Sequence, residues 1–516
     1  MAPAWRADLR TLSRWRPGVS DRLRAQLPIA GVWTAAAAVR LFRLGFQSLW
    51  CDEWFSYNLT RKPLGVLWAD AVHDAVHPPL YYLLLHPLAV RTTSEVWLRL
   101  PSVVFGVASV WLTYRLALAL TNRTAALTAA VLMTLSSFQV YHSQELRMYS
   151  MLTCFGVAAL WALWKALETL QWRYWLAFVV ASTLSLYTNY LAAALAVTAV
   201  GALVTHWRCY RRALSPFLVS AALIMVLWLP WGLAMLKGGQ GVNERRQQGS
   251  AKIATVATAG ALLEFTVGYW EGFSQFYRER PPLDTIYMAV LVIGLACAGA
   301  LLCAGICAPV GRGRKHWFAV HSLLGPLFIG FLVATQTWFK EPRYFALASP
   351  AVAVLLAGGV DSLFQRRRLL RWPATAGLFC AVAVSLLSYQ FNWRYWRDDW
   401  RSVVALVEEQ YRPGDGLVFN AGWMDQPFNH YVDLSGQKRW PTEHLPAGEG
   451  PTAKTVKEEG DRLLPRYDRL WLILCYDNVT DPKGLVSGFF DHRALFKRQW
   501  DYSGVRVRLY ECRAKV

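Results

Sequence analysis

The sequence predicts a polytopic α-helical membrane protein that ends in a small α/β domain. The chain of 516 residues is 55% hydrophobic but only 17% charged, whereas soluble proteins carry about 25% charged residues. Its apolar residues are gathered into runs about long enough to cross a membrane core of ~30 Å. The chain also has 26 tryptophans, and tryptophan favours membrane interfaces. A location in the membrane therefore explains most of the composition of the chain.

The formal net charge of +20 is of a size that often indicates a nucleic-acid partner. Here, much of the excess arginine lies in short loops between apolar runs, which is typical of cytoplasmic loops in membrane proteins. We therefore expect no nucleic-acid partner. The basic N-terminus, residues 1–26, is followed by an apolar run without a small-residue cleavage site, so we expect a retained first span and a cytoplasmic N-terminus.

Eleven apolar runs are predicted to span the membrane and to form a transmembrane domain over residues 27–391. Each run needs about 20 residues to cross. The predicted spans are 27–45, 96–118, 125–140, 148–167, 174–187, 190–207, 216–236, 283–309, 317–338, 345–363 and 372–391. This arrangement places four basic clusters on the cytoplasmic side. It places the loops 46–95, 141–150, 237–282 and 339–344 outside.

The short apolar run at residues 77–87 is treated differently because it is bounded by prolines and flanked by histidines. A run of this length is more often interfacial than spanning. Counting it as a span would also turn every later basic loop to the outside. We therefore expect it on the external surface.

From residue 392 onward, charged residues and prolines return and the apolar runs shorten. We predict an external α/β domain over residues 392–516. Residues 399–411 have helical spacing, and residues 416–420, 470–476 and 505–512 have the character of strands. Cys475 and Cys512 lie near strand ends, which leaves two alternatives: a disulfide in an oxidising compartment, or two unpaired thiols.

Five polar clusters, far apart in the sequence, fall on the predicted external side. They are Asp52-Glu53, His77, Tyr81-Tyr82, the loop with Glu145, Arg147 and Tyr149, and Arg343-Tyr344. Each has a structural explanation when taken alone, such as a solvated cap, a helix cap, or an ion pair between Glu145 and Arg147. Because ionisable groups near a membrane are costly and usually functional, their shared level favours one composite site.

The residue types in these clusters suit the transfer of a phosphate-linked group. A carboxylate can act as a general base. Arginine and histidine can bind a phosphate through charge-assisted hydrogen bonds. Tyrosine can stack on a sugar, and an apolar groove beside the site can accommodate a lipid tail.

The ordered set of motifs resembles a known family. Its members are Asp52-Glu53, His77-Pro-Pro-Leu-Tyr-Tyr, Ser94-Glu95 with Leu98-Arg99-Leu100-Pro101-Ser102, Ser143-Gln144-Glu145-x-Arg147-Met148-Tyr149, and Arg343-Tyr344 with Pro350. Over residues 27 to about 361, the chain resembles bacterial proteins of glycosyltransferase family 39, relatives of the dolichyl-phosphate-mannose protein mannosyltransferases. The lipid A aminoarabinose transferase is a more distant relative. The resemblance implies a C-type glycosyltransferase fold in the bacterial inner membrane.

The resemblance also implies a reaction, in which a sugar moves from a polyprenyl-phosphate donor to a protein, lipid or glycan acceptor on the outer face, with inversion. Asp52 would be the catalytic base, and Glu53 would support it or orient the acceptor. The donor site would be lined by His77, Tyr81 and Tyr82, with Glu145, Arg147 and Tyr149 from the external loop. Arg343 would bind the phosphate, with Tyr344 beside it. Some relatives have lysine in place of His77, so we hypothesise that activity depends on the protonation of His77.

Several alternatives stay open at this stage. No cofactor is demanded, although Asp52 and Glu53 would suit a divalent cation such as Mg²⁺ or Mn²⁺. A transporter or flippase of lipid-linked sugars would also have many spans, but its polar site would lie near the bilayer midplane, often between repeats. A non-catalytic sugar sensor is a third reading. The loop 237–282 either shapes the acceptor entrance or is a solvated connection.

Overall fold

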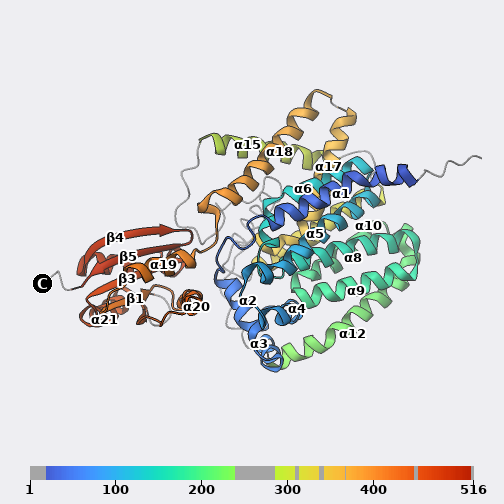
Figure 1. The fold of residues 1–516 in the computed structure, drawn as a ribbon. Coiled ribbons are helices and arrows are strands. Elements are labelled where there is room, and N and C mark those ends of the chain that lie inside the picture. The colour runs from blue at the N-terminus through green and yellow to red at the C-terminus, as the bar shows by residue number, and fades with distance from the viewer. Residues whose placement is uncertain are drawn as a thin grey trace, which may run out of the picture.

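The computed structural model describes residues 19–238, 285–307, 313–335, 342–366, 368–446 and 451–512. The basic residues 1–18 and nearly all of the loop 237–282 lie outside this range, so the predictions made for them are not addressed by the structure. A bundle of long helices forms the larger part of the molecule, and an α/β domain lies at one end of it (Figure 1).

The helical bundle contains an element at each predicted span. Its helices are α1 (Val19–Leu41), α5 (Glu95–Leu120), α6 (Arg123–Leu135), α7 (Ser137–Ser143), α8 (Tyr149–Thr169), α9 (Trp172–Thr188), α10 (Ala194–Thr205), α11 (Trp207–Tyr210), α12 (Leu214–Gly238), α15 (Thr285–Cys307), α16 (Arg314–Ala334), α17 (Ser349–Arg366) and α18 (Arg368–Phe391). Short 3-10 turns, η1 (Tyr190–Ala193) and η4 (Pro342–Ala348), precede α10 and α17. Small and aliphatic side chains from most of these helices share one continuous core.

Within the described residues, six helical stretches are long and apolar enough to cross a membrane, and a bent pair adds a seventh. The six are Glu95–Leu120, Tyr149–Thr169, Trp207–Gly238, Arg314–Ala334, Pro342–Ser362 and Trp372–Phe391. These helices fit the polytopic class predicted from the sequence. The number of eleven spans stays a prediction, because several of the predicted spans are shorter helices.

The bent pair is α6 and α7, which meet at an angle of 58°. Arg40 from α1 is fully buried at this break. Its guanidinium donates to the carbonyl oxygens of Met133 and Thr134, at 3.0 and 3.4 Å, and to Ser143 Oγ at 3.0 Å. Because buried carbonyl groups without partners are costly, these bonds stabilise the break. The bend directs α7 toward the loop at residues 144–148.

Three short helices lie beside the α/β domain end of the bundle (Figure 1). They are α2 (Cys51–Arg61), α3 (Leu64–Asp74) and α4 (Leu80–Ala89). Helix α4 has 10 residues, which is too short to cross a membrane. Its Tyr81, Tyr82 and Leu85 pack into a separate apolar cluster with residues of α2 and the start of α8.

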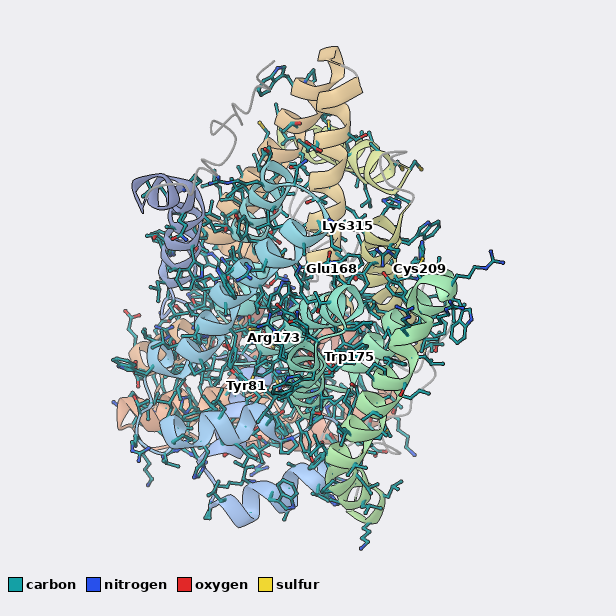
Figure 2. The ribbon with its side chains drawn as sticks, turned by 90° about the vertical axis from the view of Figure 1, so that its right-hand side faces the viewer. Tyr81, Glu168, Arg173, Trp175, Cys209 and Lys315 are labelled. Carbon is teal, nitrogen blue, oxygen red and sulfur yellow. The ribbon has the colours of Figure 1, made fainter. Side chains whose placement is uncertain are left out.

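The opposite end of the bundle carries charged turns between helices. Figure 2 views the molecule from that end and labels Glu168, Arg173, Cys209 and Lys315 there. Arg314 lies with its guanidinium 5.7 Å from the ring centroid of Tyr210, which connects two of these turns. The assignment of this end to the cytoplasmic side stays a prediction.

In the described part of the C-terminal region, five strands form one sheet in the order β2-β1-β3-β5-β4. The strands are β1 (Asp415–Phe419), β2 (Thr442–His444), β3 (Arg469–Cys475), β4 (Leu495–Tyr502) and β5 (Val505–Glu511). β1 is parallel to β2 and β3, whereas β5 is antiparallel to β3 and β4. The runs predicted as strands correspond to β1, β3 and β5.

Helices cover both faces of this sheet. They are α19 (Trp400–Gln410), α20 (Asp425–Ser435), α21 (Ala453–Leu463), α22 (Asp477–Thr480) and α23 (Leu485–Arg493). The apolar face predicted for α19 is buried through Trp400, Val403, Val404 and Val407. It packs on one side of the sheet, and Val456 and Phe490 belong to the cluster on the other. The position of this domain outside the membrane stays a prediction.

The register of β3 and β5 rules out the disulfide alternative. Cys475 pairs with Val505 at one end of the antiparallel ladder, whereas Arg469 pairs with Glu511, the neighbour of Cys512, at the other. Both thiols are free. The two cysteines lie near the ends of neighbouring strands, as expected, but those ends are opposite ones.

Candidate active site

The first turn of α2 places Asp52 between two arginines from distant parts of the chain. Arg343 Nη1 donates to Asp52 Oδ2 at 2.6 Å, and Arg147 Nη2 lies 3.7 Å from the same oxygen. The carboxylate also benefits from the N-terminal end of its helix. The Asp52 side chain keeps 29% of its surface exposed, so a substrate can reach it.

The arginines control the charge of Asp52. Burial on its own raises the pKa of this carboxyl, but the guanidinium groups of Arg343 and Arg147 outweigh that effect and hold the pKa at about 2. Asp52 is therefore ionised at neutral pH. It is also a weak base while both arginines remain beside it.

Arg147 connects Asp52 to His77. Its Nη1 donates to Ser56 Oγ at 3.0 Å, and its Nη2 donates to His77 Nε2 at 2.9 Å. Because a guanidinium can only donate, His77 Nε2 must accept. His77 is thus neutral in this state, with its proton on Nδ1. The structure brings Asp52, His77, Arg147 and Arg343 together, as expected for one composite site.

Glu53 follows Asp52 in the chain but belongs to a separate network. Arg99 binds it through two hydrogen bonds of 2.8 and 2.7 Å, and the backbone N–H of Leu146 donates to Oε1 at 2.7 Å. The side chains of Glu53 and Arg99 are 0% and 1% exposed. Glu53 therefore stabilises the loop after α7, and its predicted catalytic role is without direct support in this geometry.

Aromatic groups surround Arg343. Its guanidinium lies 5.8 Å from the ring centroids of both Trp50 and Tyr149. This arrangement leaves a cationic group over apolar surface, where an ion of opposite charge is bound more strongly than in water. Tyr344, the neighbour of Arg343, is partly buried and packs against the main core of the bundle.

The remaining predicted residues lie in the wall around this cluster. Tyr81 Oη and Ser102 Oγ are 3.0 Å apart, and Ser102 Oγ donates to the carbonyl oxygen of Arg147. Glu145 Oε2 lies 2.9 Å from His142 Nδ1. In place of the ion pair considered between Glu145 and Arg147, Glu145 has a hydrogen bond with His142. In the described part of the chain, Glu145 Oε1 and Tyr82 Oη are buried without a hydrogen-bond partner.

The described carboxylates of this site are not arranged to hold a divalent cation. Asp52 and Glu53 are paired with arginines of different networks. Among the residues that the structure describes, no group of three or more histidine, cysteine, aspartate or glutamate side chains is arranged to hold a metal ion.

Sequence reasoning gave no role to Arg99, which it named only within a motif, and it missed Arg397. Arg99 and Arg397 are both buried, and both contact the elements that carry Asp52 and Arg147. Arg99 had a detectable signal, because an arginine at the start of an apolar span needs a buried partner. Arg397 had none, since it lies in a charged stretch that reads as a linker.

The fold and this cluster define a class: a polytopic membrane protein with an arginine-rich site at one end of its helical bundle. Residues 76–233 match the model of the family described as dolichyl-phosphate-mannose-protein mannosyltransferase. The resemblance to glycosyltransferase family 39 is thereby confirmed. No curated protein matches the whole chain or part of it by sequence.

Solved structures share the fold. ArnT from Cupriavidus metallidurans, bound to undecaprenyl phosphate, is similar with a TM-score of 0.52 and 11% identity, over 95% of this chain and 99% of that one. The archaeal oligosaccharyltransferase AglB from Archaeoglobus fulgidus, in complex with an inhibitory peptide and a dolichol-phosphate, has the same TM-score and identity, over 95% of this chain and 75% of AglB. The chain therefore has the C-type glycosyltransferase fold.

Proposed function

We propose that this protein is a membrane glycosyltransferase that moves a sugar from a polyprenyl-phosphate donor to an acceptor on the external face of the membrane. The observation that carries the proposal is the contact of Asp52 with Arg343 and Arg147. A carboxylate and two guanidinium groups are what a displacement at a sugar phosphate needs: a base for the acceptor and cations for the leaving phosphate.

The similar structures support the class of donor. ArnT is described with undecaprenyl phosphate and AglB with a dolichol-phosphate. Both ligands are phosphates of long polyprenyl chains. In this chain, Arg343 and Arg147 are the described cations beside Asp52, and we assign the donor phosphate to them.

Binding of the phosphate would change Asp52. An anion that takes up the hydrogen bonds of Arg343 competes with the carboxylate for the same guanidinium, so Asp52 is released. Because the arginines lower the pKa of Asp52, their engagement with the phosphate raises that pKa again. The donor thus converts Asp52 from a weak base into a stronger one at the moment when a base is needed.

The chemical step follows from this arrangement. Asp52 accepts the proton of the acceptor nucleophile while the nucleophile attacks the anomeric carbon. The bond from that carbon to the phosphate oxygen breaks, and the polyprenyl phosphate leaves with the bonding electron pair, stabilised by Arg343 and Arg147. A single displacement inverts the configuration at the anomeric carbon.

Two buried polar atoms in the wall are the proposed partners of the sugar. Glu145 Oε1 and Tyr82 Oη are without a hydrogen-bond partner among the described residues. Since buried polar atoms are normally paired, sugar hydroxyl groups are suitable partners for these two. Asp52, Glu145 and Tyr82 would then line one donor site. The C-terminal domain would lie on the external side of a bacterial inner membrane.

A transfer assay tests the proposal. Radiolabelled polyprenyl-phosphate sugars would be offered singly to the purified full-length protein with protein, lipid and glycan acceptors. We expect a labelled product of inverted configuration and release of polyprenyl phosphate in equal amount. Movement of an intact donor across a proteoliposome membrane, without cleavage, would instead indicate a transporter and overturn the proposal.

A further inference from the structure

Arg397 lies in the segment that joins the last long helix, α18, to the α/β domain, and it is 4% exposed. We propose that Arg397 is a positioning residue for the reaction, which fixes both the loop that carries Arg147 and the segment that leads to Asp52. The inference rests on the proposed function. It implies that contacts from the C-terminal region help to hold Arg147 and Asp52 in position.

The first contact of Arg397 is with the end of α7. Its Nη2 donates to the carbonyl oxygen of Tyr141 and its Nη1 to that of Gln144, both at 3.0 Å. These carbonyls belong to the last turn of α7 and to its C-cap, where carbonyl groups need partners from outside the helix. The Tyr141 carbonyl oxygen also accepts from the backbone N–H of Gln144 at 3.1 Å. A cation at this position satisfies both groups and interacts favourably with the helix dipole. The guanidinium also lies 4.4 Å from the ring centroid of Tyr141.

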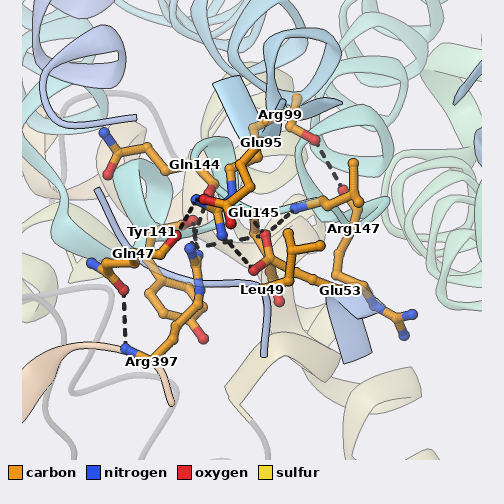
Figure 3. Close-up of polar contacts among 12 residues, drawn as sticks. Gln47, Leu49, Glu53, Glu95, Arg99, Tyr141, Gln144, Glu145, Arg147 and Arg397 are labelled. Carbon is orange, nitrogen blue, oxygen red and sulfur yellow. Dashed lines mark hydrogen bonds and ion pairs between the residues drawn. The ribbon is translucent and has the colours of Figure 1, made fainter. Parts of the chain in front are cut away.

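The loop after α7 leads from this cap to the reaction centre. Gln144 is followed by Glu145, Leu146 and Arg147, and Arg147 contacts both Asp52 and His77. The direction in which the chain leaves α7 therefore determines where the Arg147 guanidinium lies. Figure 3 shows Arg397, Tyr141 and Gln144 on one side of this loop and Arg147 on the other.

The second contact of Arg397 is with the segment before α2. Its backbone N–H donates to Gln47 Oε1 at 3.0 Å, and its Nη1 lies 4.0 Å from Glu53 Oε1. Arg99 binds Glu53 and the carbonyl oxygen of Gln47 from the other side. Glu53 is thus between two arginines, and Asp52 is its neighbour in the chain (Figure 3).

The α/β domain also contacts the segment before α2 through a second residue, Tyr431. Tyr431 of α20 accepts a hydrogen bond from the backbone N–H of Leu49 at 2.6 Å and donates to Glu95. Glu95 in turn lies 3.8 Å from Arg99. Contacts from two sides therefore connect the docked domain to Glu53. A loss of these contacts would leave α2 and the 144–148 loop free to shift relative to each other.

The test is the turnover of Arg397→Gln and Arg397→Lys in the full-length protein. A displacement of about 1 Å in a catalytic group can cost ~10²-fold in rate. We therefore expect Arg397→Gln to lower kcat per folded molecule by about that factor and to raise the donor KM by a smaller factor, because Arg147 shifts whereas Arg343, the other proposed phosphate ligand, keeps its contacts. Arg397→Lys should recover part of the loss, since lysine can still donate to a helix C-terminus.

Arg439→Gln is the matched control. Arg439 belongs to the same α/β domain and donates to Asp433, but this pair is exposed and has no hydrogen bond to α7, to Glu53 or to the segment before α2 among the described residues. We expect its kcat to remain within about twofold of wild type. A kcat for Arg397→Gln equal to that of this control, at equal folded protein, would overturn the inference and leave the proposed function intact.

A second readout does not depend on transfer. The shifts in Tm for Arg397→Gln, Glu53→Gln and the double variant should be non-additive, since residues in one network are coupled. Additive shifts would contradict the positioning network. A wild-type protein without any transfer activity would overturn the proposed function, and the Tm comparison would still decide whether the network exists.

Discussion

Arg343 Nη1 lies 2.6 Å from Asp52 Oδ2, although the two residues are 291 positions apart in the chain. The contact joins the first helix after the first long apolar run to the turn η4, which precedes α17. It pairs the proposed base with a proposed phosphate ligand. In the proposed mechanism, this pairing keeps Asp52 a weak base until the donor phosphate takes over the hydrogen bond of Arg343.

Arg343→Gln should weaken donor binding and change the pH dependence of activity. One charge-assisted hydrogen bond contributes about 1.5–3 kcal/mol, so we expect the donor KM to rise at least tenfold. Since Arg343 helps to hold the pKa of Asp52 at about 2, its removal raises that pKa. The acid limb of kcat/KM therefore moves to higher pH, and rate profiles measured from pH 4 to 8 would show it. Unchanged profiles and KM would contradict this role.

His77→Lys tests the hypothesis that histidine protonation tunes the site. In the donor-free structure His77 Nε2 accepts from Arg147, so the ring is neutral. A lysine there remains charged at neutral pH and would repel Arg147. We expect the variant to lose the pH dependence that protonation of His77 would give the wild-type protein. An identical pH profile for the two proteins would refute the hypothesis.

Glu53→Gln should lower the stability of the protein far more than the loss of one charge from an exposed ion pair does. Removing one partner of a buried ion pair leaves the other charge uncompensated and costs about 3–5 kcal/mol. Asp70→Asn is the control, because Asp70 and Lys62 form a pair with 41% and 40% exposure, and such pairs contribute about 1 kcal/mol or less. Thermal unfolding in detergent would compare them, and equal Tm values would show that Arg99 does not depend on Glu53.

Asp398→Asn should remove a pH dependence of stability. Burial raises the pKa of Asp398 to about 7, and Tyr476, which donates to its Oδ2 at 2.9 Å, only partly offsets this. A carboxyl with a raised pKa stabilises the fold at low pH, and this contribution is lost as the pH rises from about 4 to 7. The Tm of wild type should therefore fall relative to Asp398→Asn between pH 5 and 7. Parallel Tm curves would argue against a neutral Asp398.

The sequence allowed the polar cluster to be predicted because membrane geometry reduces the choices. Once the apolar runs are placed, Asp52, His77, Arg147 and Arg343 fall at one level, and the structure brings them within one network. The short helix α4 was predicted from the length of its apolar run, its flanking prolines and the charge of the later loops. In both cases the predicted spans fix the depth of a residue relative to the bilayer, which is information that the sequence of a soluble protein does not give.

Other features depend on three-dimensional details that no pattern encodes. Neighbouring residues on a helix point about 100° apart, so Asp52 and Glu53 entered different networks despite their adjacency. The register of β3 and β5 separated Cys475 from Cys512. Arg397 reaches Gln144 across 253 residues, and a contact of that length has no local signature.

The central claim, that Asp52 is the base of a sugar transfer, is tested most directly by Asp52→Asn. Wild type and variant would be run side by side with the donor that supports transfer, and both release of polyprenyl phosphate and binding of donor would be measured. The account predicts that Asp52→Asn binds the donor within about tenfold of wild type but loses at least ~10²-fold in release, the low end of a general base contribution. Equal release by the two proteins would contradict the account.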